Sequence, residues 1–436
     1  MKNIKSRAYS TLLVAVCLLA GILVYVCRYA TQARDWVTFP ANEAVYKNGR
    51  LIAGEILDRR GVILADVADG ARRYAADSAT RVACLHLLGD REGNIGTGAL
   101  LQFADLLTGY SAVTGLNAGG ETLRLSVDSA LCVTAQEALA GRKGAVLLMD
   151  YTNGEILCMT SSLSYDPDQG FDPGDARYEG VFINRCISAA YTPGSVFKLV
   201  TTAAAIETLP DLYERSFNCT GSVLVDGNQI NCTGVHGQQT IEQALANSCN
   251  CAFATLSLEL GGETLQRYAD ALGLTETLSL NGITTVRGSF DAAGDGSAAL
   301  AWSGIGQSTD LVCPYALLRY VAAIGNGGVL AEPTLFAGGS SRESAKLLSP
   351  DTAQALKSMM NYNVVYAYGA GSFPGLTLCA KSGTAEVGDG SSHAWFTGFL
   401  DDPDHPYAFV VVIENGGGGL RNAGPVANAV LQAAVS

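Results

Sequence analysis

The sequence predicts an α+β chain that carries one membrane-spanning helix at its N-terminus. An uncharged stretch from Ala8 to Cys27 is close to the roughly 20 residues that a helix needs to cross a bilayer. From residue 141 onward, hairpin-like strand patterns stand at both ends of the segment, and helical periodicity fills its middle. At 436 residues, of which 48% are hydrophobic, the chain is long enough for the membrane helix and two domains.

The membrane helix is expected to be an uncleaved anchor. Three basic residues precede the apolar stretch: Lys2, Lys5 and Arg7. Positive charge on this side keeps the N-terminus in the cytoplasm and sends the following chain outside. A cleaved signal peptide is the alternative, but the apolar run is longer than a typical signal core and Thr31-Gln32-Ala33 is a poor cleavage site. We therefore expect a single-pass protein of the cell membrane, with its N-terminus in the cytoplasm and the domains after the span outside.

The chain divides into an anchor at residues 8–27, a short N-terminal domain at 28–140 and a larger domain at 141–436. In the short domain we expect strands and two helical segments. The larger domain is expected to run from a hairpin through a helical middle to a second hairpin and a closing helix, with proline in that helix's first turn. The expected helices cover residues 98–107, 129–139, 196–208, 256–272, 316–324 and 425–435, and the closing hairpin joins 395–400 to 407–413.

The first candidate catalytic segment is Ser195-Val196-Phe197-Lys198, which follows a Pro-Gly turn. Ser195 stands at a predicted helix start, where unpaired backbone N–H groups favour a developing oxyanion. Lys198, three residues on, lies on the same helix face. A serine nucleophile needs a base, and lysine serves as one only if burial or a second cation, for which Lys381 is a candidate, lowers its pKa. Taken alone, the pair also fits an N-cap serine and a solvated lysine.

The second candidate segment is Ser248-Cys249-Asn250. Residues two apart point the same way only on an extended or loop segment. A hydroxyl and an amide placed in this way could relay a leaving-group proton and hold the amide backbone of a substrate. A helix-capping pair is a credible alternative for this segment in isolation.

The third candidate segment is Lys381-Ser382-Gly383-Thr384, which follows a short apolar run. The pattern is typical of a strand whose edge faces a groove. A cation from Lys381 and hydroxyls from Ser382 and Thr384 suit a substrate carboxylate, and Gly383 lets a substrate backbone approach closely. The alternative is a strand that ends in a polar turn.

As an ordered trio, the three segments resemble the motifs of the penicillin-recognising serine acyltransferases. Further segments extend the resemblance over most of residues 50 to 420 and are similar to those of class B penicillin-binding proteins, which are membrane-anchored peptidoglycan D,D-transpeptidases. These segments are Gly54–Ala65, Gly144–Asp150, Asn153–Leu157, Ser164–Pro167, His236-Gly237, Gly304–Gln307 and His393–Gly398. The chain departs from the family pattern in its short region 28–140, in Ser308 where glycine is frequent, and in Ser382 where threonine is commoner.

The resemblance implies a penicillin-binding-protein/β-lactamase-like fold, with an antiparallel sheet and flanking helices beside an all-helical lobe. A transmembrane helix and a short pedestal domain would precede this transpeptidase domain. It also implies acyl transfer, in which Ser195 attacks the carbonyl between two terminal D-alanines of a peptidoglycan stem peptide. The expected catalytic residues are Ser195, Lys198, Ser248, Asn250 and Lys381, and the expected substrate-binding residues are Ser382, Gly383 and Thr384.

The partners implied by the resemblance are stem peptides, lipid-linked precursors, β-lactams and a SEDS-family glycan polymerase. A D,D-carboxypeptidase or a serine β-lactamase would use the same trio but pass the acyl group to water. The anchor and the Asp58-Arg59-Arg60-Gly61 segment disfavour these alternatives. A non-enzymatic β-lactam sensor or cell-wall scaffold is disfavoured because every catalytic position holds a competent residue.

Composition excludes some ligands and leaves others open. The net charge of −13 argues against nucleic-acid binding, which needs a basic surface. We expect no cofactor and no metal: Cys249, Cys251 and His236 could suggest a metal site, but no four-ligand spacing appears. Cys219 and Cys232 flank a predicted hairpin over residues 220–231 and could form a disulfide in an oxidising compartment, whereas a reducing habitat would leave both as thiols.

Overall fold

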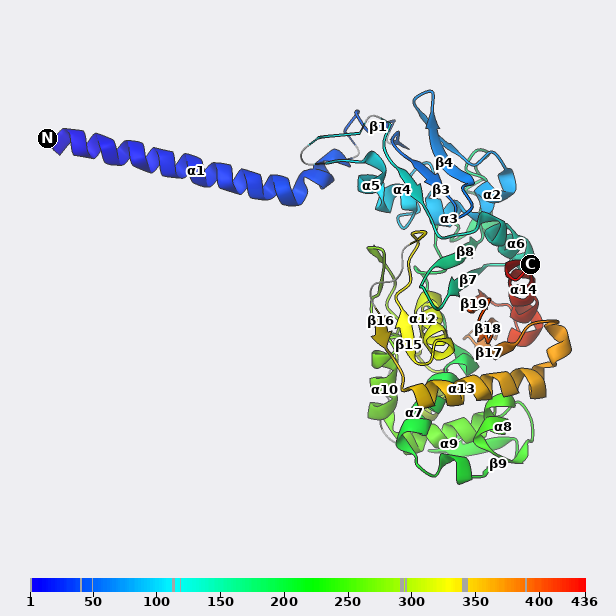
Figure 1. Cartoon of the computed structure of the whole chain (residues 1–436). Coiled ribbons are helices and arrows are strands. Elements are labelled where there is room, and N and C mark those ends of the chain that lie inside the picture. Colours follow the sequence, from blue (N-terminus) through cyan, green and yellow to red (C-terminus); the bar gives the residue numbers. More distant parts are fainter. Residues whose placement is uncertain are drawn as a thin grey trace.

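A computed structural model of the chain describes residues 2–39, 41–48, 50–111, 114–117, 119–290, 294, 296–338, 344–388 and 390–436. The first element, α1 (Lys2–Val37), is one long helix that stands away from the rest of the molecule (Figure 1). Its residues Ile4–Ala33 are apolar enough to cross a membrane, and none of the most apolar window is buried against protein. Among the described residues it is the only such helix, which agrees with a single N-terminal anchor.

The N-terminal domain is built on a small sheet of strand order β5-β4-β3-β6, in which β3 and β6 are parallel. The strands of this sheet are β3 (Glu55–Leu57), β4 (Ile63–Ala68), β5 (Ala71–Tyr74) and β6 (Thr122–Arg124). A separate pair consists of β1 (Tyr46–Lys47) and β2 (Arg50–Leu51). The helices of the domain are α2 (Ser78–Ala83), α3 (Leu85–Leu88), α4 (Ala99–Gln102) and α5 (Ala104–Thr108). Asp58, after β3, is fully buried and accepts hydrogen bonds from the backbone N–H groups of Arg60 and Val62. Its other oxygen accepts from the Ser129 hydroxyl at 2.7 Å, which ties the sheet to the start of α6 (Ser129–Leu139).

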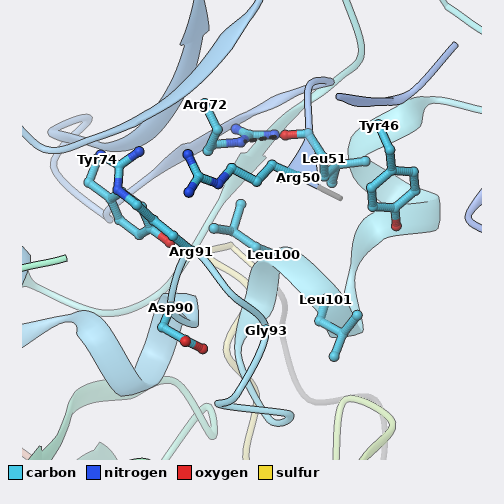
Figure 2. Close-up of a pocket in the computed structure, with 10 residues that line it drawn as sticks. All are labelled: Tyr46, Arg50, Leu51, Arg72, Tyr74, Asp90, Arg91, Gly93, Leu100 and Leu101. Carbon is cyan, nitrogen blue, oxygen red and sulfur yellow. Dashed lines mark hydrogen bonds between the residues drawn. The ribbon is translucent and has the colours of Figure 1, made fainter. Parts of the chain in front are cut away.

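A pocket opens in this domain, between β2, β5 and α4 (Figure 2). Three arginines lie around it: Arg50, Arg72 and Arg91. The buried Arg72 guanidinium donates to the carbonyl oxygens of residues 51, 53 and 54, and Arg91 pairs with Asp168. Arg50 is paired with Glu92, so each of the three arginines has an acceptor within the protein.

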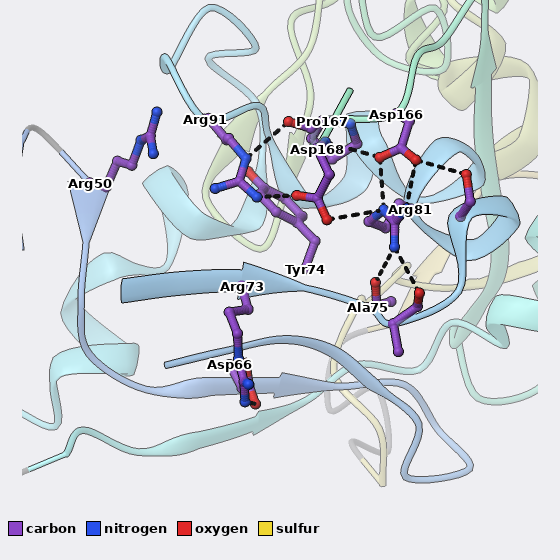
Figure 3. Close-up of polar contacts among 12 residues, drawn as sticks. Arg50, Asp66, Arg73, Tyr74, Ala75, Arg81, Arg91, Asp166, Pro167 and Asp168 are labelled. Atoms are coloured by element: carbon purple, nitrogen blue, oxygen red, sulfur yellow. Dashed lines mark hydrogen bonds and ion pairs between the residues drawn. The ribbon is translucent and has the colours of Figure 1, made fainter. Parts of the chain in front are cut away.

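The N-terminal domain is joined to the larger domain through a pair of arginines (Figure 3). Arg81 of α2 donates from Nε and Nη2 to both oxygens of Asp166, each at 2.7 Å. This bidentate pair is nearly buried and lowers the pKa of the Asp166 carboxyl well below its usual range. Arg91 adds a hydrogen bond to the Pro167 carbonyl at 2.9 Å. The segment Ser164–Pro167, which carries part of the family resemblance, therefore lies at the contact between the two domains.

The larger domain is organised around a five-stranded antiparallel sheet of order β17-β18-β19-β7-β8 (Figure 1). Its strands are β7 (Gly144–Asp150), β8 (Ile156–Ser162), β17 (Leu378–Glu386), β18 (Ser392–Leu400) and β19 (Tyr407–Ile413). Helices α6 and α14 (Gly419–Ala434) pack together on one side of it, and α12 (Pro314–Gly325) packs on the other. With both faces covered, β19 is buried from its second residue to its last. Strand β17 forms one edge of the sheet, as the third segment predicted.

Most of the chain between β8 and β17 forms a mainly helical lobe, which lies beside β17. Its helices are α7 (Lys198–Thr208), α8 (Ile241–Ala246), α9 (Asn250–Leu260), α10 (Gly262–Ala271), α11 (Ala298–Ser303) and α13 (Pro350–Asn363). This part of the chain also contains short antiparallel strand pairs: β9 (Phe217–Cys219) with β12 (Gly237–Gln239), β10 (Ser222–Val225) with β11 (Asn228–Asn231), β13 (Ser279–Leu280) with β14 (Ile283–Thr284), and β15 (Val329–Ala331) with β16 (Ser344–Lys346). The predicted α+β fold, with a sheet and a helical lobe, is confirmed.

Two local predictions are wrong. The closing helix begins at Gly419, so Pro425 lies in its interior and not in its first turn. Pro425 has no backbone N–H and cannot donate a helical hydrogen bond. Packing of α14 against β18 and α6 keeps the helix continuous through this position. Cys219 and Cys232 are free thiols. The hairpin between them forms, but β9 pairs with β12 and not with β11, so the two cysteines are not cross-strand partners.

Candidate active site

The three predicted segments meet in one groove between β17 and the helical lobe. The groove has a volume of about 500 Å³. From the predicted set, Ser195, Ser248, Asn250, Ser382 and Thr384 line it, together with residues that include Trp302, Gln307, Tyr368 and Glu386. Lys198 and Lys381 lie fully buried below its surface. The structure thus brings together residues that are up to 189 positions apart, since the set runs from Ser195 to Thr384.

Ser195 lies in a single 3₁₀ turn, Gly194–Val196, immediately before α7. Gly194 has a left-handed backbone (φ 55°), and its N–H donates to the Gly306 carbonyl at 2.7 Å. A Cβ on Gly194 would lie 2.8 Å from the Thr384 carbonyl oxygen, so only glycine lets this turn sit against β17. The close contact fixes the nucleophile next to the strand that carries the third segment.

The Lys198 ammonium is the centre of the polar network. Its Nζ lies 3.0 Å from Ser195 Oγ, 3.2 Å from Ser248 Oγ and 2.7 Å from Asn250 Oδ1. It also donates to the Ser248 carbonyl at 2.7 Å. A base within hydrogen-bond reach of a serine hydroxyl is the geometry that nucleophile activation needs.

Burial lowers the pKa of Lys198 to about 7. Burial also lowers the pKa of Lys381 well below its usual value, and the charge of Lys198 lowers it further. Both amines lie within 3.2 Å of the same Ser248 hydroxyl. Repulsion between the two positive charges disfavours the state in which both amines are protonated near neutral pH. Burial, one of the two causes that the sequence suggested, is thus the main reason that the pKa of Lys198 is low.

Ser248 and Asn250 project into the groove from a helix junction. Ser248 has a left-handed backbone (φ 53°) in the loop between α8 and α9, and Asn250 is the first residue of α9. The cap of α9 is Cys249, whose sulfur accepts from the Ala252 N–H, so the capping interpretation of the Ser/Asn pair is wrong. The Asn250 amide is oriented from both ends, because its Nδ2 donates to the Asn231 carbonyl at 2.9 Å while its Oδ1 accepts from Lys198.

Successive side chains of β17 point to opposite faces of the strand, so the four residues of the third segment have two different environments. Ser382 and Thr384 face the groove, whereas Lys381 and Gly383 are buried. A Cβ on Gly383 would lie 3.0 Å from the Pro193 carbonyl oxygen and 3.0 Å from a methyl group of Val196. The missing side chain at Gly383 thus makes room for the Ser195 turn, and the close approach of a substrate backbone expected from the sequence stays a prediction.

One residue of the site had no signal in the sequence. The hydroxyl of Tyr368 accepts from the Ser382 N–H at 3.0 Å and lies 3.2 Å from Ser382 Oγ. Tyr368 stands at the end of a π-helical turn, Val364–Tyr368, that follows α13. Two other tyrosines precede it within six positions, so nothing in the local pattern distinguishes the one that reaches β17.

Comparison with known proteins gives a consistent result. Residues 144–432 match the family described as penicillin binding protein transpeptidase domain. The chain is 29% identical over 331 residues to the peptidoglycan D,D-transpeptidase PbpA of Mycobacterium tuberculosis, covering 67% of each protein. It is 27% identical to stage V sporulation protein D of Bacillus subtilis, covering 88% of this chain and 67% of that protein. The fold is similar to the D,D-transpeptidase domain of a peptidoglycan glycosyltransferase from Eggerthella lenta, with TM-score 0.74, 26% identity and coverage of 88% and 98%.

Proposed function

Because this chain belongs to the penicillin-binding protein transpeptidase family, we propose that it cross-links peptidoglycan through an acyl-enzyme on Ser195. It is a serine-type peptidoglycan D,D-transpeptidase. The single observation that carries the assignment of the nucleophile is the 3.0 Å contact between Ser195 Oγ and the buried amine of Lys198. A base with a pKa of about 7 is matched to neutral pH, where it is neutral in a large fraction of molecules.

In the first step, neutral Lys198 takes the proton of Ser195 as Oγ attacks the carbonyl between the two terminal D-alanines of a stem peptide. Backbone N–H groups of Ser195 and Thr384 would hold the oxyanion. The C–N bond then breaks, and the leaving D-alanine takes a proton relayed through Ser248. Ser248 suits this relay because its hydroxyl contacts both Lys198 and Lys381, at 3.2 and 3.1 Å.

In the second step, an amine of a neighbouring stem peptide attacks the acyl-enzyme and loses a proton to Lys198. The C–O bond to Ser195 breaks as the cross-link forms, and Lys198 returns the proton to Ser195 Oγ. Ser382 and Thr384 would bind the terminal carboxylate of the donor peptide, since both hydroxyls face the groove. On the protein side, each proton passes through groups that are already in hydrogen-bond contact, since Lys198 contacts both Ser195 and Ser248.

We further propose that α1 holds the protein in the cell membrane with its N-terminus in the cytoplasm and its catalytic domain outside. The basic residues before the apolar span support this orientation. Lipid-linked precursors would supply the donor strands, and a SEDS-family glycan polymerase would be the partner in the membrane. β-Lactams would acylate Ser195, because their strained amide and carboxylate imitate the D-alanyl-D-alanine end of the stem peptide.

Covalent labelling with a fluorescent penicillin tests the proposal. The label should attach to the one peptide that contains Ser195, and it should persist because the tethered leaving group cannot depart. Ser195→Ala should abolish labelling with little change in folding, since loss of a hydroxyl near a helix start costs about 0.5–2 kcal/mol. Ser216→Ala, at an exposed serine outside the groove, is the matched control and should label at the full rate.

Two outcomes would contradict the assignment. Full-rate labelling of Ser195→Ala would place the nucleophile elsewhere. Rapid release of the label would instead indicate a β-lactamase, in which water takes the acyl group.

A further inference from the structure

Four potential metal ligands converge next to the catalytic loop: Cys219, Cys232, His236 and Cys249. Their sulfur and ring-nitrogen atoms all lie within 4.8 Å of one another. They come from three segments, which are the end of β9, the loop between β11 and β12, and the N-cap of α9. Cys219 and Cys249 are buried, and the other two are half-buried. Such convergence of soft ligands from separate segments is typical of a structural metal site.

The distances from Cys232 to two of the other ligands fit a tetrahedral ion. Cys232 Sγ lies 3.7 Å from Cys249 Sγ and 3.5 Å from His236 Nδ1. A tetrahedral zinc ion with Zn–S bonds of about 2.3 Å and a Zn–N bond of about 2.0–2.1 Å separates sulfur from sulfur by about 3.8 Å, and sulfur from nitrogen by about 3.6 Å. A disulfide needs an S–S distance of about 2.0 Å, which the 3.7 Å separation of Cys232 and Cys249 far exceeds.

We propose that these side chains bind one Zn²⁺ in a Cys₃His site. Three thiols and one imidazole are a typical ligand set of structural zinc, and tetrahedral sulfur–nitrogen coordination selects Zn²⁺ among the common divalent ions. With four protein ligands the ion has no open position for water or substrate, so the site is structural. Binding forms three Zn–S bonds and one Zn–N bond and releases the three thiol protons to solvent.

The site bears directly on the catalytic loop, because Cys249 stands between Ser248 and Asn250. The Asn250 N–H donates to Cys232 Sγ at 3.2 Å, so a second ligand also holds this loop. Both Ser248 and Asn250 contact Lys198. Zinc would thus fix the second catalytic segment relative to the base. This effect on catalysis rests on the proposed function, whereas metal binding itself rests only on the ligand geometry.

Metal content tests the site without reference to activity. The full chain, purified in detergent, should hold one zinc per chain by elemental analysis. Replacement of zinc by Co²⁺ should produce the absorption of cobalt–thiolate charge transfer. His236→Ala and Cys232→Ala should lose the ion, and His236→Cys should retain it because a Cys₄ set also binds zinc. Cys313→Ala is the matched control: it removes a buried thiol outside the four-ligand cluster, one that donates to the carbonyls of residues 186 and 187, and zinc should stay.

Acylation by fluorescent penicillin then tests the role of the ion. Removal of zinc by a chelator should slow acylation about 10²-fold, the cost of a small misplacement of catalytic groups, and added Zn²⁺ should restore the rate. An unchanged rate in the zinc-free protein would overturn the positioning role. Free thiols in a folded chain without stoichiometric metal, or a disulfide between any two of the three cysteines, would overturn the site. Ser195→Ala should lose labelling but keep its zinc, so failure of the catalytic assignment is distinguishable from failure of the metal site.

Discussion

Replacing Asn250 by aspartate tests how the environment of Lys198 sets its basicity. Asn250 Oδ1 accepts from Lys198 Nζ at 2.7 Å. Asn250→Asp keeps the size of the side chain and places a carboxylate oxygen at that position. The negative charge stabilises the ammonium form, so the pKa of Lys198 should rise from its value of about 7.

The size of the rise follows from the geometry. At 2.7 Å and an effective dielectric constant of about 20, Coulomb attraction is about 6 kcal/mol, an upper limit because burial penalises both charges. Carboxylate–cation pairs commonly shift a pKa by about 1–3 units, which would move Lys198 to about 8–10. A raised pKa means that the base is lost as the pH falls through the new value. Acylation at neutral pH should therefore fall about tenfold to a thousandfold and recover in alkaline buffer.

The assay is the rate of labelling by excess fluorescent penicillin across the neutral and alkaline range. The native chain should show a rate that rises with pH to a plateau, with a midpoint near the Lys198 pKa of about 7. Asn250→Asp should reach its plateau at higher pH. Asn250→Ala, which removes the amide but adds no charge, controls for the lost hydrogen bond to the Asn231 carbonyl. An Asn250→Asp midpoint equal to that of the native chain, or below it, would refute Lys198 as the base.

Two further predictions concern the nucleophile turn and the membrane helix. Gly383→Ala should slow acylation about 10²-fold without changing the pH midpoint, because the new methyl group would lie 3.0 Å from the Pro193 carbonyl and displace the Ser195 turn. Gly371→Ala is the control, since a Cβ there meets nothing within 4 Å, and it should label normally. Protease added to intact spheroplasts should digest the domains beyond α1. On a gel, the band of the full chain labelled with penicillin should disappear. Survival of those domains, or their release as a soluble form that begins near Arg34, would contradict the proposed topology.

The fold class was predictable from local patterns, and the candidate catalytic segments were identified by the resemblance of the ordered trio to a known family. Short apolar runs indicated the hairpin strands β18 and β19, which are buried on both faces, and helical periodicity predicted α6 with the limits that the structure has. The single apolar span at the N-terminus was equally clear. Helix limits were less predictable, because the start of α14 depends on packing against β18 that overrides the local preference of Pro425.

The sequence by itself determined that Ser195, Lys198 and Lys381 belong to one type of site, because short motifs encode the chemistry of their own side chains. Only the tertiary structure decided what surrounds each group. Burial lowers the pKa of Lys198, and the depth of that burial depends on residues brought together from the whole lobe. The partnership of Cys219 with Cys232, His236 and Cys249 also arises in three dimensions, since strand pairing turns the expected disulfide partners toward a common centre. Distances between segments are set by packing, which no spacing along the chain records.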